Sequence, residues 1–329
     1  MKSNPLVSVD CDTLVYSAAA SCELRSILVT HAPSGISKKF SNRTEFKSTM
    51  KAKNKVITDD YLITDIQEPS DVSHALKLVK NSVEKILDNF SDCEVVLCAT
   101  ASNNFRGLLP YPNSYKNNRK SAIRPLLLED TQKYILGKYK AVRAEGHEVD
   151  DLVGILAYEA LSQGREAYIL SPDGDCRQFD GVKLGKYQDT PEDCFKIEFM
   201  HDIAWSDKGI QTWGFPWMIF QGTVGDITDG LTPRFLCKAR YGEKGCFNDI
   251  KDITSPEKLV QYSIEKYKEW YPEPFVYTTW DGKQQQADWK FMLELYWKGT
   301  TMKRSYHEEP DFWKFLKDKQ VQIDQKDFL

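Results

Sequence analysis

The stretch Leu6-Val-Ser-Val-Asp10-Cys-Asp12-Thr-Leu-Val-Tyr16 joins a short apolar run to an acidic turn and then to a second apolar run. Residues 6–9 have the length and composition of a buried β-strand, and residues 14–21 have the spacing of a helix that follows it. Asp10 therefore stands at the carboxyl end of a strand, where an aspartate is either a helix cap or part of a site. Asp12 is open to the same two interpretations.

The alternation of strand and helix continues beyond this stretch. Further strands are predicted at 94–99, 139–143 and 167–170, with helices at 71–89, 128–136 and 149–163. This order predicts an α/β fold with a mostly parallel central sheet flanked by helices. Ligands bind beyond the carboxyl ends of the strands in such sheets, so Asp10, the turn after Ala99 and Asp173 are expected at one rim.

Two regions depart from this pattern. A hairpin at 26–40, a polar helix at 42–53 and an edge strand at 59–68 interrupt it early in the chain. Beyond Pro191, helical periodicity dominates, at 210–221, 256–270, 284–297 and 310–319, and all eight tryptophans lie between Trp205 and Trp313. We therefore expect an α/β core over residues 1–190 and a helical lobe with an aromatic core over residues 191–329.

The bulk composition is that of a globular protein in a reducing compartment. Of the 329 residues, 41% are hydrophobic and 28% are charged, and no run of 18 apolar residues occurs, which argues against a membrane protein. The eight cysteines are scattered without a CxxC pair, and the N-terminus has no signal-peptide pattern. These features predict a cytoplasmic protein, which we expect to be monomeric.

Acidic side chains gather in four short clusters, each at a predicted strand end, turn or helix start. The clusters are Asp10 with Asp12, Glu148 with Asp150 and Asp151, Asp173 with Asp175, and Asp226 with Asp229. Each has a simple explanation, because acids in a first turn stabilise a helix by roughly 0.3–1 kcal/mol and Asp-Gly sequences form turns. Together they predict a pocket lined with carboxylates, which repel one another unless divalent cations are bound. Two Mg²⁺ ions, replaceable by Mn²⁺, fit such a pocket, whereas the scarcity of histidine disfavours zinc.

A basic segment separates the first two clusters. Residues 102–128 contain five cations and no acid, namely Arg106, Lys116, Arg119, Lys120 and Arg124. A solvated loop is the simplest explanation, yet Phe105, Tyr111 and Tyr115 lie among the cations. Aromatic rings stack on unpaired bases while cations hold phosphates, so this segment predicts a nucleic-acid interface. Lys116 or Arg119 is placed to neutralise charge on the scissile phosphate.

These motifs, in this order, resemble the flap-endonuclease superfamily, and most closely the 5′-to-3′ exonucleases of tailed phages. The matching segments are Val-Asp10-x-Asp-x-Leu-Val-Tyr16, Tyr115-Lys-x-Asn-Arg-Lys120, Glu148-x-Asp-Asp-x-x-Gly154, Ser171-x-Asp-x-Asp175 and Gln221-Gly-x-x-Gly-Asp226-Ile-Thr-Asp229-Gly230, which together span residues 9–230. The resemblance implies a metal-dependent 5′ nuclease that hydrolyses DNA, and RNA primers as well, with a role in phage replication, primer removal or DNA turnover. Its partners would be DNA with a free 5′ end or a 5′ flap, or an RNA–DNA hybrid.

The resemblance also implies a role for each cluster. Asp10, Glu148 and Asp150 would bind the first metal and act in catalysis, with Asp151 beside them. The second metal would be held by Asp173, Asp175, Asp226 and Asp229. The helical lobe over residues 191–329 would thus complete the metal site, and its part after Asp229 would bind duplex DNA. Residues 103–125 would form a helical arch that admits a single-stranded 5′ end. In this arch Lys116 and Arg119 would contact the scissile phosphate, Tyr115 would stack on a base, and Arg106, Lys120 and Arg124 would bind the backbone.

Two departures from that pattern stand out. Ala101 occupies the position after the strand at 94–99 where relatives carry a metal-site aspartate, so Asn103 or Asn104 would have to assist the first metal. The glycine-rich hairpin that binds potassium in the family has no counterpart in Leu231–Arg240. A K⁺ site would therefore lack the glycine pattern that usually forms it. Arg234, Lys238 and Arg240 remain available to contact a duplex.

Two alternatives to a nuclease stay open. Ala101 motivates a structure-specific DNA-binding protein with impaired cleavage. Asp10-x-Asp12 after a buried strand is also similar to the nucleophile motif of haloacid-dehalogenase-type phosphatases, although Leu14 stands where Thr or Val is usual. The phosphatase reading leaves the clusters at 148–151 and 226–229 and the basic segment unexplained.

Overall fold

The computed structural model describes residues 4–119, 122–307 and 309–323. The chain divides into two compact units. The first comprises residues 1–12, 85–122 and 139–329, and the second comprises residues 13–84 and 123–138. Both sides of residue 190 belong to the first unit, and the assignment of residues 191–329 to duplex binding stays a prediction.

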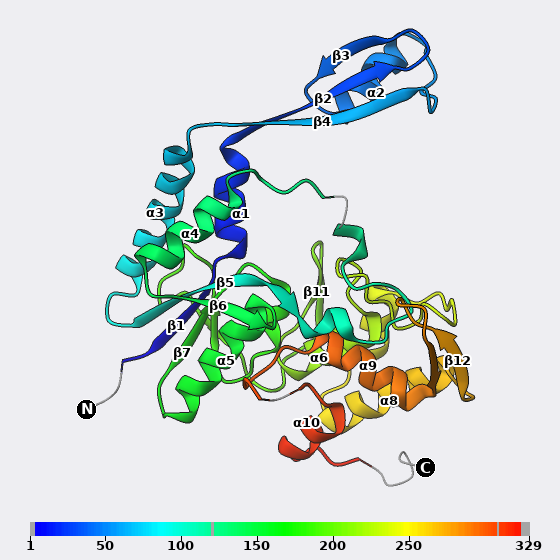
Figure 1. The fold of residues 1–329 in the computed structure, drawn as a ribbon. Helices are drawn as coiled ribbons and strands as arrows, with labels where there is room; N and C mark the ends of the chain where they lie inside the picture. The colour runs from blue at the N-terminus through cyan, green and yellow to red at the C-terminus, as the bar shows by residue number, and fades with distance from the viewer. Residues whose placement is uncertain (1–3, 120–121, 308, 324–329) are drawn as a thin grey trace. The chain divides into compact units, whose positions relative to one another are not determined.

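A six-stranded sheet forms the centre of the first unit (Figure 1). Its strands are β1 (Leu6–Asp10), β5 (Glu94–Asn104), β6 (Ala141–Gly146), β7 (Ala167–Leu170), β8 (Lys183–Gly185) and β9 (Phe195–Lys196), in the order β6-β5-β1-β7-β8-β9. All neighbouring pairs are parallel except β8 and β9. The predicted α/β class with a mostly parallel sheet is therefore confirmed.

Helix α5 (Val149–Ser162) covers one face of this sheet. Its apolar residues Leu152, Val153 and Ala157 join Val96, Cys98 and Ile169 of the strands in one buried cluster. The backbone N–H of Glu148 donates to Asp151 (3.0 Å), which fixes the first turn of the helix. Because α5 follows β6 directly, its acidic first turn is held at the carboxyl edge of the sheet.

The remainder of the first unit has an aromatic core, as predicted, but it is not purely helical. Its helices are α6 (Phe215–Val224), α7 (Glu243–Ile250), α8 (Pro256–Trp270), α9 (Trp289–Thr300) and α10 (Phe312–Asp318), with hairpins β10–β11 (Ala204–Ser206, Gly209–Gln211) and β12–β13 (Phe275–Thr278, Gln284–Ala287). The predicted helices at 210–221 and 284–297 both start too early. Gly214 (φ 65°) sets the start of α6, and the Asp288 side chain caps α9 by accepting from the N–H of Phe291 (2.8 Å).

The basic segment is not a helical arch in this structure. Its described part contains two short 3₁₀ turns, η1 (Phe105–Leu108) and η2 (Asn117–Arg119), joined by irregular chain. Pro110 and Pro112 lie between the turns and interrupt helical hydrogen bonding. Lys120 lies outside the described residues.

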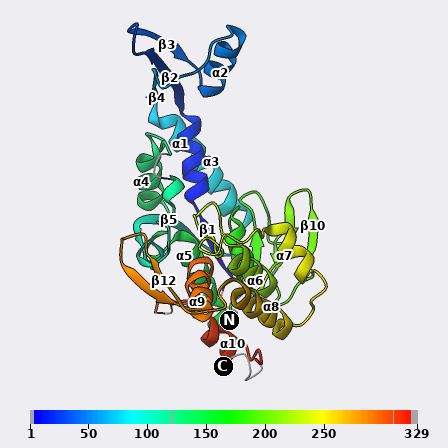
Figure 2. The same ribbon diagram turned by 90° about the vertical axis from the view of Figure 1, so that its right-hand side faces the viewer.

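The second unit contains α1 (Asp12–Ser21) except its first residue, α3 (Val72–Asn89) up to residue 84, α4 (Leu128–Lys138) and a small α/β module. The module has a three-stranded antiparallel sheet in the order β3-β2-β4, formed by Ile36–Phe40, Glu23–His31 and Tyr61–Pro69, and its helix is α2 (Arg43–Ala52) (Figure 2). Phe46 and Met50 of α2 pack on Ile27, Val29 and Phe40. The predicted hairpin, polar helix and edge strand are confirmed. None of the described helices is long and apolar enough to cross a bilayer.

Candidate active site

Asp10 lies at the carboxyl edge of the sheet with little access to solvent. It is the last residue of β1 and is 3% exposed. The backbone N–H of Asp12 donates to its Oδ1 (2.9 Å), and the hydroxyl of Ser171 donates to its Oδ2 (2.8 Å). These two bonds orient the carboxylate without neutralising its charge.

Three further carboxylates repel Asp10 or one another at this edge. Burial raises the pKa of Asp150 well above its ordinary value, and the charges of Asp10, Asp173 and Asp175 raise it further. Burial, followed by repulsion from Asp173 and Asp226, likewise raises the pKa of Asp175. Burial together with the charge of Asp12 raises the pKa of Asp10 to about 7. We call Asp10, Asp150, Asp173 and Asp175 the acidic edge.

The acidic edge fits divalent cations in its chemistry. All of its donors are carboxylate oxygens, the ligands that Mg²⁺ and Mn²⁺ prefer, and the pKa values of Asp10, Asp150 and Asp175 are raised. Among the residues that the structure describes, no three His, Cys, Asp or Glu side chains are grouped so that they could hold a metal ion. Bound cations would therefore have to draw these carboxylates together.

The basic segment meets two other predicted ligands, Glu148 and Asp229. Lys116 forms ion pairs with both, the one to Asp229 measuring 3.3 Å. Arg119 donates to Asp229 (2.6 Å). The hydroxyl of Tyr115 contacts both carboxylates, at 2.9 Å from Glu148 and 2.6 Å from Asp229. The structure thus brings together the predicted phosphate-binding cations and two of the predicted metal ligands.

The loop that carries Asp226 and Asp229 is shaped by its own hydrogen bonds. Oδ1 of Asp226 accepts from the N–H of Thr228 (2.7 Å) and from the N–H of Asp229 (3.2 Å). The carbonyl of Asp229 in turn accepts from the N–H of Lys116 (2.8 Å). Burial, followed by the charge of Asp229, raises the pKa of Asp226. Backbone and side-chain bonds together therefore tie this acidic loop to the basic segment.

Asp151 and Arg106 have different roles from those predicted. Both are fully buried, and Arg106 donates two hydrogen bonds to Asp151 (2.6 and 2.9 Å). Burial alone would raise the pKa of Asp151, but the charge and hydrogen bonds of Arg106 lower it below its ordinary value. Asp151 also accepts from the N–H groups of Glu148 and Lys303. The carboxylate oxygens of Asp151 therefore all accept hydrogen bonds from within the protein, instead of lying beside a metal. Arg106 is buried and therefore inaccessible to nucleic acid.

Two polar side chains make contacts close to Ala101 in the sequence, and Ala101 itself lies within β5, which runs beyond the predicted end at 99. Oδ1 of Asp12 accepts from the N–H of Thr100 (3.0 Å), which ties that carboxylate to β5. The side-chain amide of Asn104 donates to Glu148 (3.2 Å), and its assistance to the first metal stays a prediction. Burial raises the pKa of Asp12, so this acid is more than a solvent-exposed helix cap.

Two residues of the site received no role from the sequence. Ser171 bonds Asp10, and the side-chain amide of Gln221 donates to Asp175 (2.5 Å). Both residues lie inside the motifs quoted above. Their place next to the acids in those motifs could have indicated a role in orienting the carboxylates. Arg124, predicted to bind nucleic acid, belongs to the second unit, where its side chain is exposed and its carbonyl accepts from Gln67 (2.8 Å).

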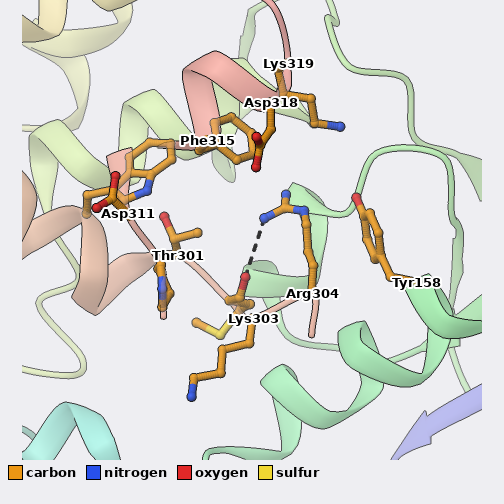
Figure 3. A pocket seen from close by; sticks show the side chains of 11 residues that line it. Tyr158, Thr301, Lys303, Arg304, Asp311, Phe315, Asp318 and Lys319 are labelled. Atoms are coloured by element: carbon orange, nitrogen blue, oxygen red, sulfur yellow. Dashed lines mark hydrogen bonds between the residues drawn. The ribbon is translucent and has the colours of Figure 1, made fainter. Parts of the chain in front are cut away.

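A cavity of about 120 Å³ lies apart from the acidic edge, between α5 and the C-terminal residues (Figure 3). Tyr158, Lys303, Arg304 and Phe315 are among its lining residues, and the Arg304 guanidinium lies over the Tyr158 ring at 5.3 Å. It contains none of the acidic-edge carboxylates. The cavity borders the segment 301–304 that binds the Arg106–Asp151 pair, so we interpret it as part of the packing that supports α5.

The raised pKa of Asp10 predicts an unusual pH dependence of stability in metal-free protein. Between its ordinary pKa of 3.8 and about 7, folded Asp10 holds a proton that the unfolded chain releases. The unfolding free energy should therefore fall as the pH rises through this range, by up to about 4 kcal/mol. Urea unfolding in EDTA at about pH 5 and about pH 8 measures this, with Asp10→Asn as the variant that flattens the profile.

Divalent cations should reverse that loss. At about pH 8, millimolar Mg²⁺ should raise the melting temperature clearly, because bound cations neutralise the ionised carboxylates. At about pH 5 the same addition should have a smaller effect, because protons compete for the ligands. An equal effect at both pH values, or none at pH 8, would contradict the assignment of the acidic edge as a cation site.

Comparison with known proteins gives only distant structural similarity. No family model matches the chain, and no curated protein does. A protein of phage T5 co-crystallised with metal ions is similar over 80% of this chain and 92% of its own, with 13% identity and a TM-score of 0.40. A bacteriophage T5 flap endonuclease in complex with DNA and metal ions is 14% identical, over 60% of this chain and 77% of its own, with a TM-score of 0.38. A T5 5′-exonuclease mutant is 11% identical, over 90% of this chain and 83% of its own, with a TM-score of 0.38.

Proposed function

We propose that this chain is a divalent-metal-dependent nuclease that hydrolyses DNA phosphodiester bonds from a 5′ end. The observation that carries the proposal is a group of carboxylates with raised pKa values together with a basic segment that forms ion pairs with two further acids of the same predicted site. Lys116 contacts Glu148 and Asp229, while Asp10, Asp150 and Asp175 have raised pKa values. An acidic, cation-requiring pocket beside cations suits chemistry on a polyanion.

The ligands divide between two cation positions in this proposal. Asp10, Glu148 and Asp150 would hold the first, and Asp173, Asp175, Asp226 and Asp229 the second, with Asp151 left out because Arg106 occupies it. Two divalent ions, Mg²⁺ or Mn²⁺, supply an activated water and neutralise the scissile phosphate. Ser171 and Gln221 would keep Asp10 and Asp175 oriented while the cations bind.

Lys116 and Arg119 would exchange partners when substrate binds. In this structure they form ion pairs with Glu148 and Asp229. With those carboxylates acting as metal ligands, the two side chains would be available to a phosphate, where cations stabilise the charge that develops in the transition state. Tyr115, whose hydroxyl now contacts the same acids, would be freed to stack on a base.

Replacing Lys116 by methionine tests two roles of this side chain separately: its ion pairs with Glu148 and Asp229, and its proposed contact with the phosphate. We expect the variant to reach half-maximal activity at a lower Mg²⁺ concentration, because no ammonium competes for Glu148 and Asp229. Its turnover at saturating Mg²⁺ should fall by roughly 10²-fold, because a charge that stabilises the transition state is lost. Mg²⁺ titrations of single-turnover cleavage measure both quantities. Unchanged turnover would remove Lys116 from the catalytic group.

The polarity and substrate are tested with labelled DNA. A 5′-labelled flap and a 5′-labelled blunt duplex are incubated in Mg²⁺ with wild type and with Asp173→Ala. Release of short labelled products from the wild type alone supports a 5′ nuclease, and the product lengths separate exonuclease from flap cutting. Tight binding without cleavage by either protein would favour the DNA-binding alternative, and an Ala101→Asp variant would then show whether the absent carboxylate is responsible. Hydrolysis of small phosphomonoesters without DNA cleavage would favour the phosphatase.

A further inference from the structure

We propose that the small module of the second unit is a separate binding surface for the phosphate backbone of duplex DNA. The surface is formed by Lys47 and Lys51 of α2 and by Lys53 and Lys55 just after it, and we call it the lysine surface. It lies within the insertion at 23–69, which takes no part in the proposed chemistry. It would add affinity for DNA without altering the hydrolytic step.

The module carries a local charge opposite to that of the whole protein. Residues 38–55 contain seven Lys or Arg and one acid, Glu45, whereas the whole chain has a net charge of −4. A strongly basic surface on an acidic protein creates a local field that attracts polyanions. Acids nearby in the sequence do not balance these positive charges, because the next acids after residue 55 are Asp59 and Asp60.

The cations of this stretch divide into those already paired and those that face solvent. Arg43 forms a two-pronged bond with Asp65 of β4 (2.5 and 2.7 Å), and Lys39 pairs with Glu68 (2.8 Å). Within the described part of the module, the four side chains of the lysine surface are all exposed and have no ion pair to an acid. The seventh cation, Lys38, lies over the Phe40 ring at 5.0 Å. The module therefore uses two cations for its own ion pairs and one for a ring contact, and leaves four for a partner.

The lysine surface is held in place by regular backbone. Phe46 and Met50 anchor one side of α2 on the sheet, so Lys47 and Lys51, one turn apart at about 6 Å of helix rise, lie along its flank. Asn54 adopts a left-handed conformation (φ 51°) and the N–H of Lys55 returns to the carbonyl of Met50 (3.0 Å), a common helix ending. The chain beyond the helix is thereby fixed, and Lys53 and Lys55 stay beside its end.

Two features indicate the kind of partner. One lysine near a helix end is explained by the helix dipole, but four exceed what the last turn requires. The aromatic rings of residues 38–55, Phe40 and Phe46, are both buried, so the surface has cations without a platform for unpaired bases. Proteins that bind single strands combine cations with such platforms, whereas contacts to a duplex backbone need only the cations. Duplex DNA fits these features better than a single strand or an acidic protein.

The salt dependence of DNA binding tests this proposal. Lys47, Lys51 and Lys55 are changed together to glutamine in the full chain carrying Asp173→Ala, and binding of a fluorescent blunt duplex of about 30 base pairs is followed by anisotropy at several salt concentrations in Mg²⁺. Each phosphate contact contributes about 0.9 to the slope of log K against log salt, so we expect the slope to fall by about two to three units. Affinity at low salt should fall at least tenfold.

A matched control removes the same charge from another helix, α3. Lys77, Lys80 and Lys85 are exposed on α3, and their change to glutamine should leave the slope within about 0.5 of the parent. Equal slopes for both triple variants, whether both fall or neither does, overturn the proposal, as does an effect on single strands alone. Because binding is measured in the Asp173→Ala background, the two proposals fail separately: a fallen slope together with a wild-type chain that hydrolyses no DNA would reject the proposed function and keep the lysine surface. Normal DNA cleavage by the wild type together with an unchanged slope would keep the proposed function and reject the lysine surface.

Discussion

Replacing Asp150 by asparagine is expected to abolish DNA cleavage and, at the same time, to stabilise the metal-free protein. Asp150 is the acid of α5 that Asp10, Asp173 and Asp175 all repel, and its pKa is raised well above the ordinary value by burial and by those charges. Asparagine keeps the shape and removes the charge. Turnover should fall by about 10³-fold or more, which corresponds to roughly 4 kcal/mol of lost transition-state stabilisation. The unfolding free energy in EDTA at about pH 8 should rise by about 1–3 kcal/mol.

The two opposite changes make this prediction specific. A purely structural aspartate would lose stability on replacement, and a surface aspartate would change neither property. Asp92→Asn, which removes an exposed carboxylate of the same unit, is the control and should leave both quantities within error. Cleavage by the Asp150→Asn protein at the wild-type rate, or a loss of its stability in EDTA, would show that the acidic edge is not a site under electrostatic strain.

Removing Arg106 is expected to have the largest effect on folding. Arg106 and Asp151 are both completely buried, and Arg106 also donates to the carbonyls of Gly299 and Thr301. The Arg106→Met variant leaves a buried carboxylate without its counter-charge, which costs about 3–5 kcal/mol of unfolding free energy. The double variant Arg106→Met/Asp151→Asn should recover part of this loss, because the buried charge is gone, although the single amide oxygen of asparagine can replace only one of the two carboxylate oxygens that accept from the N–H groups of Glu148 and Lys303. Urea unfolding of the four proteins forms the cycle, and additive losses would contradict a direct pair.

The Arg106–Asp151 pair also has a defined pH signature. The folded pKa of Asp151 is lowered, so the stability that the pair contributes is fully present above the ordinary pKa near 3.9 and is lost as the pH falls through the lower folded value. This direction is opposite to that of Asp10, whose destabilising effect grows toward neutral pH. The double variant should therefore lose less stability than wild type below about pH 4.

The sequence predicted four of the six strands of the sheet, because these four contain apolar runs, and it did not predict β8 and β9, which are only three and two residues long. Leu6–Asp10, Ala167–Leu170 and the hairpin of the small module all lie where periodicity placed them. It failed at α6 and α9, because apolar spacing alone does not show that Gly214 and Asp288 set the helix starts. The arch was also mispredicted, since Pro110 and Pro112 interrupt any helix between the two 3₁₀ turns.

For the candidate site, the sequence indicated which acidic and basic residues to consider, but not which of them form ion pairs. Spacing at i, i+3 placed Glu148 and Asp151 on one side of α5, yet only the fold shows that Arg106 occupies Asp151. A buried arginine partner more than 40 positions away in the chain leaves no local pattern. The contacts of Lys116 with Glu148 and Asp229 likewise depend on long-range folding that brings three segments together. The roles of the remaining acids stay predictions.

The number of divalent ions that bind to the acidic edge tests the central claim most directly. Mn²⁺ is titrated into the full chain at about pH 8, and free Mn²⁺ is counted by electron paramagnetic resonance, for wild type and for the double variant Asp173→Asn/Asp175→Asn. We expect about two ions per wild-type chain and the loss of at least one in the variant, with melting temperatures showing both proteins folded. Wild type that binds no Mn²⁺ at millimolar concentration, or a variant that binds as many ions as wild type, would contradict a two-cation site at this edge.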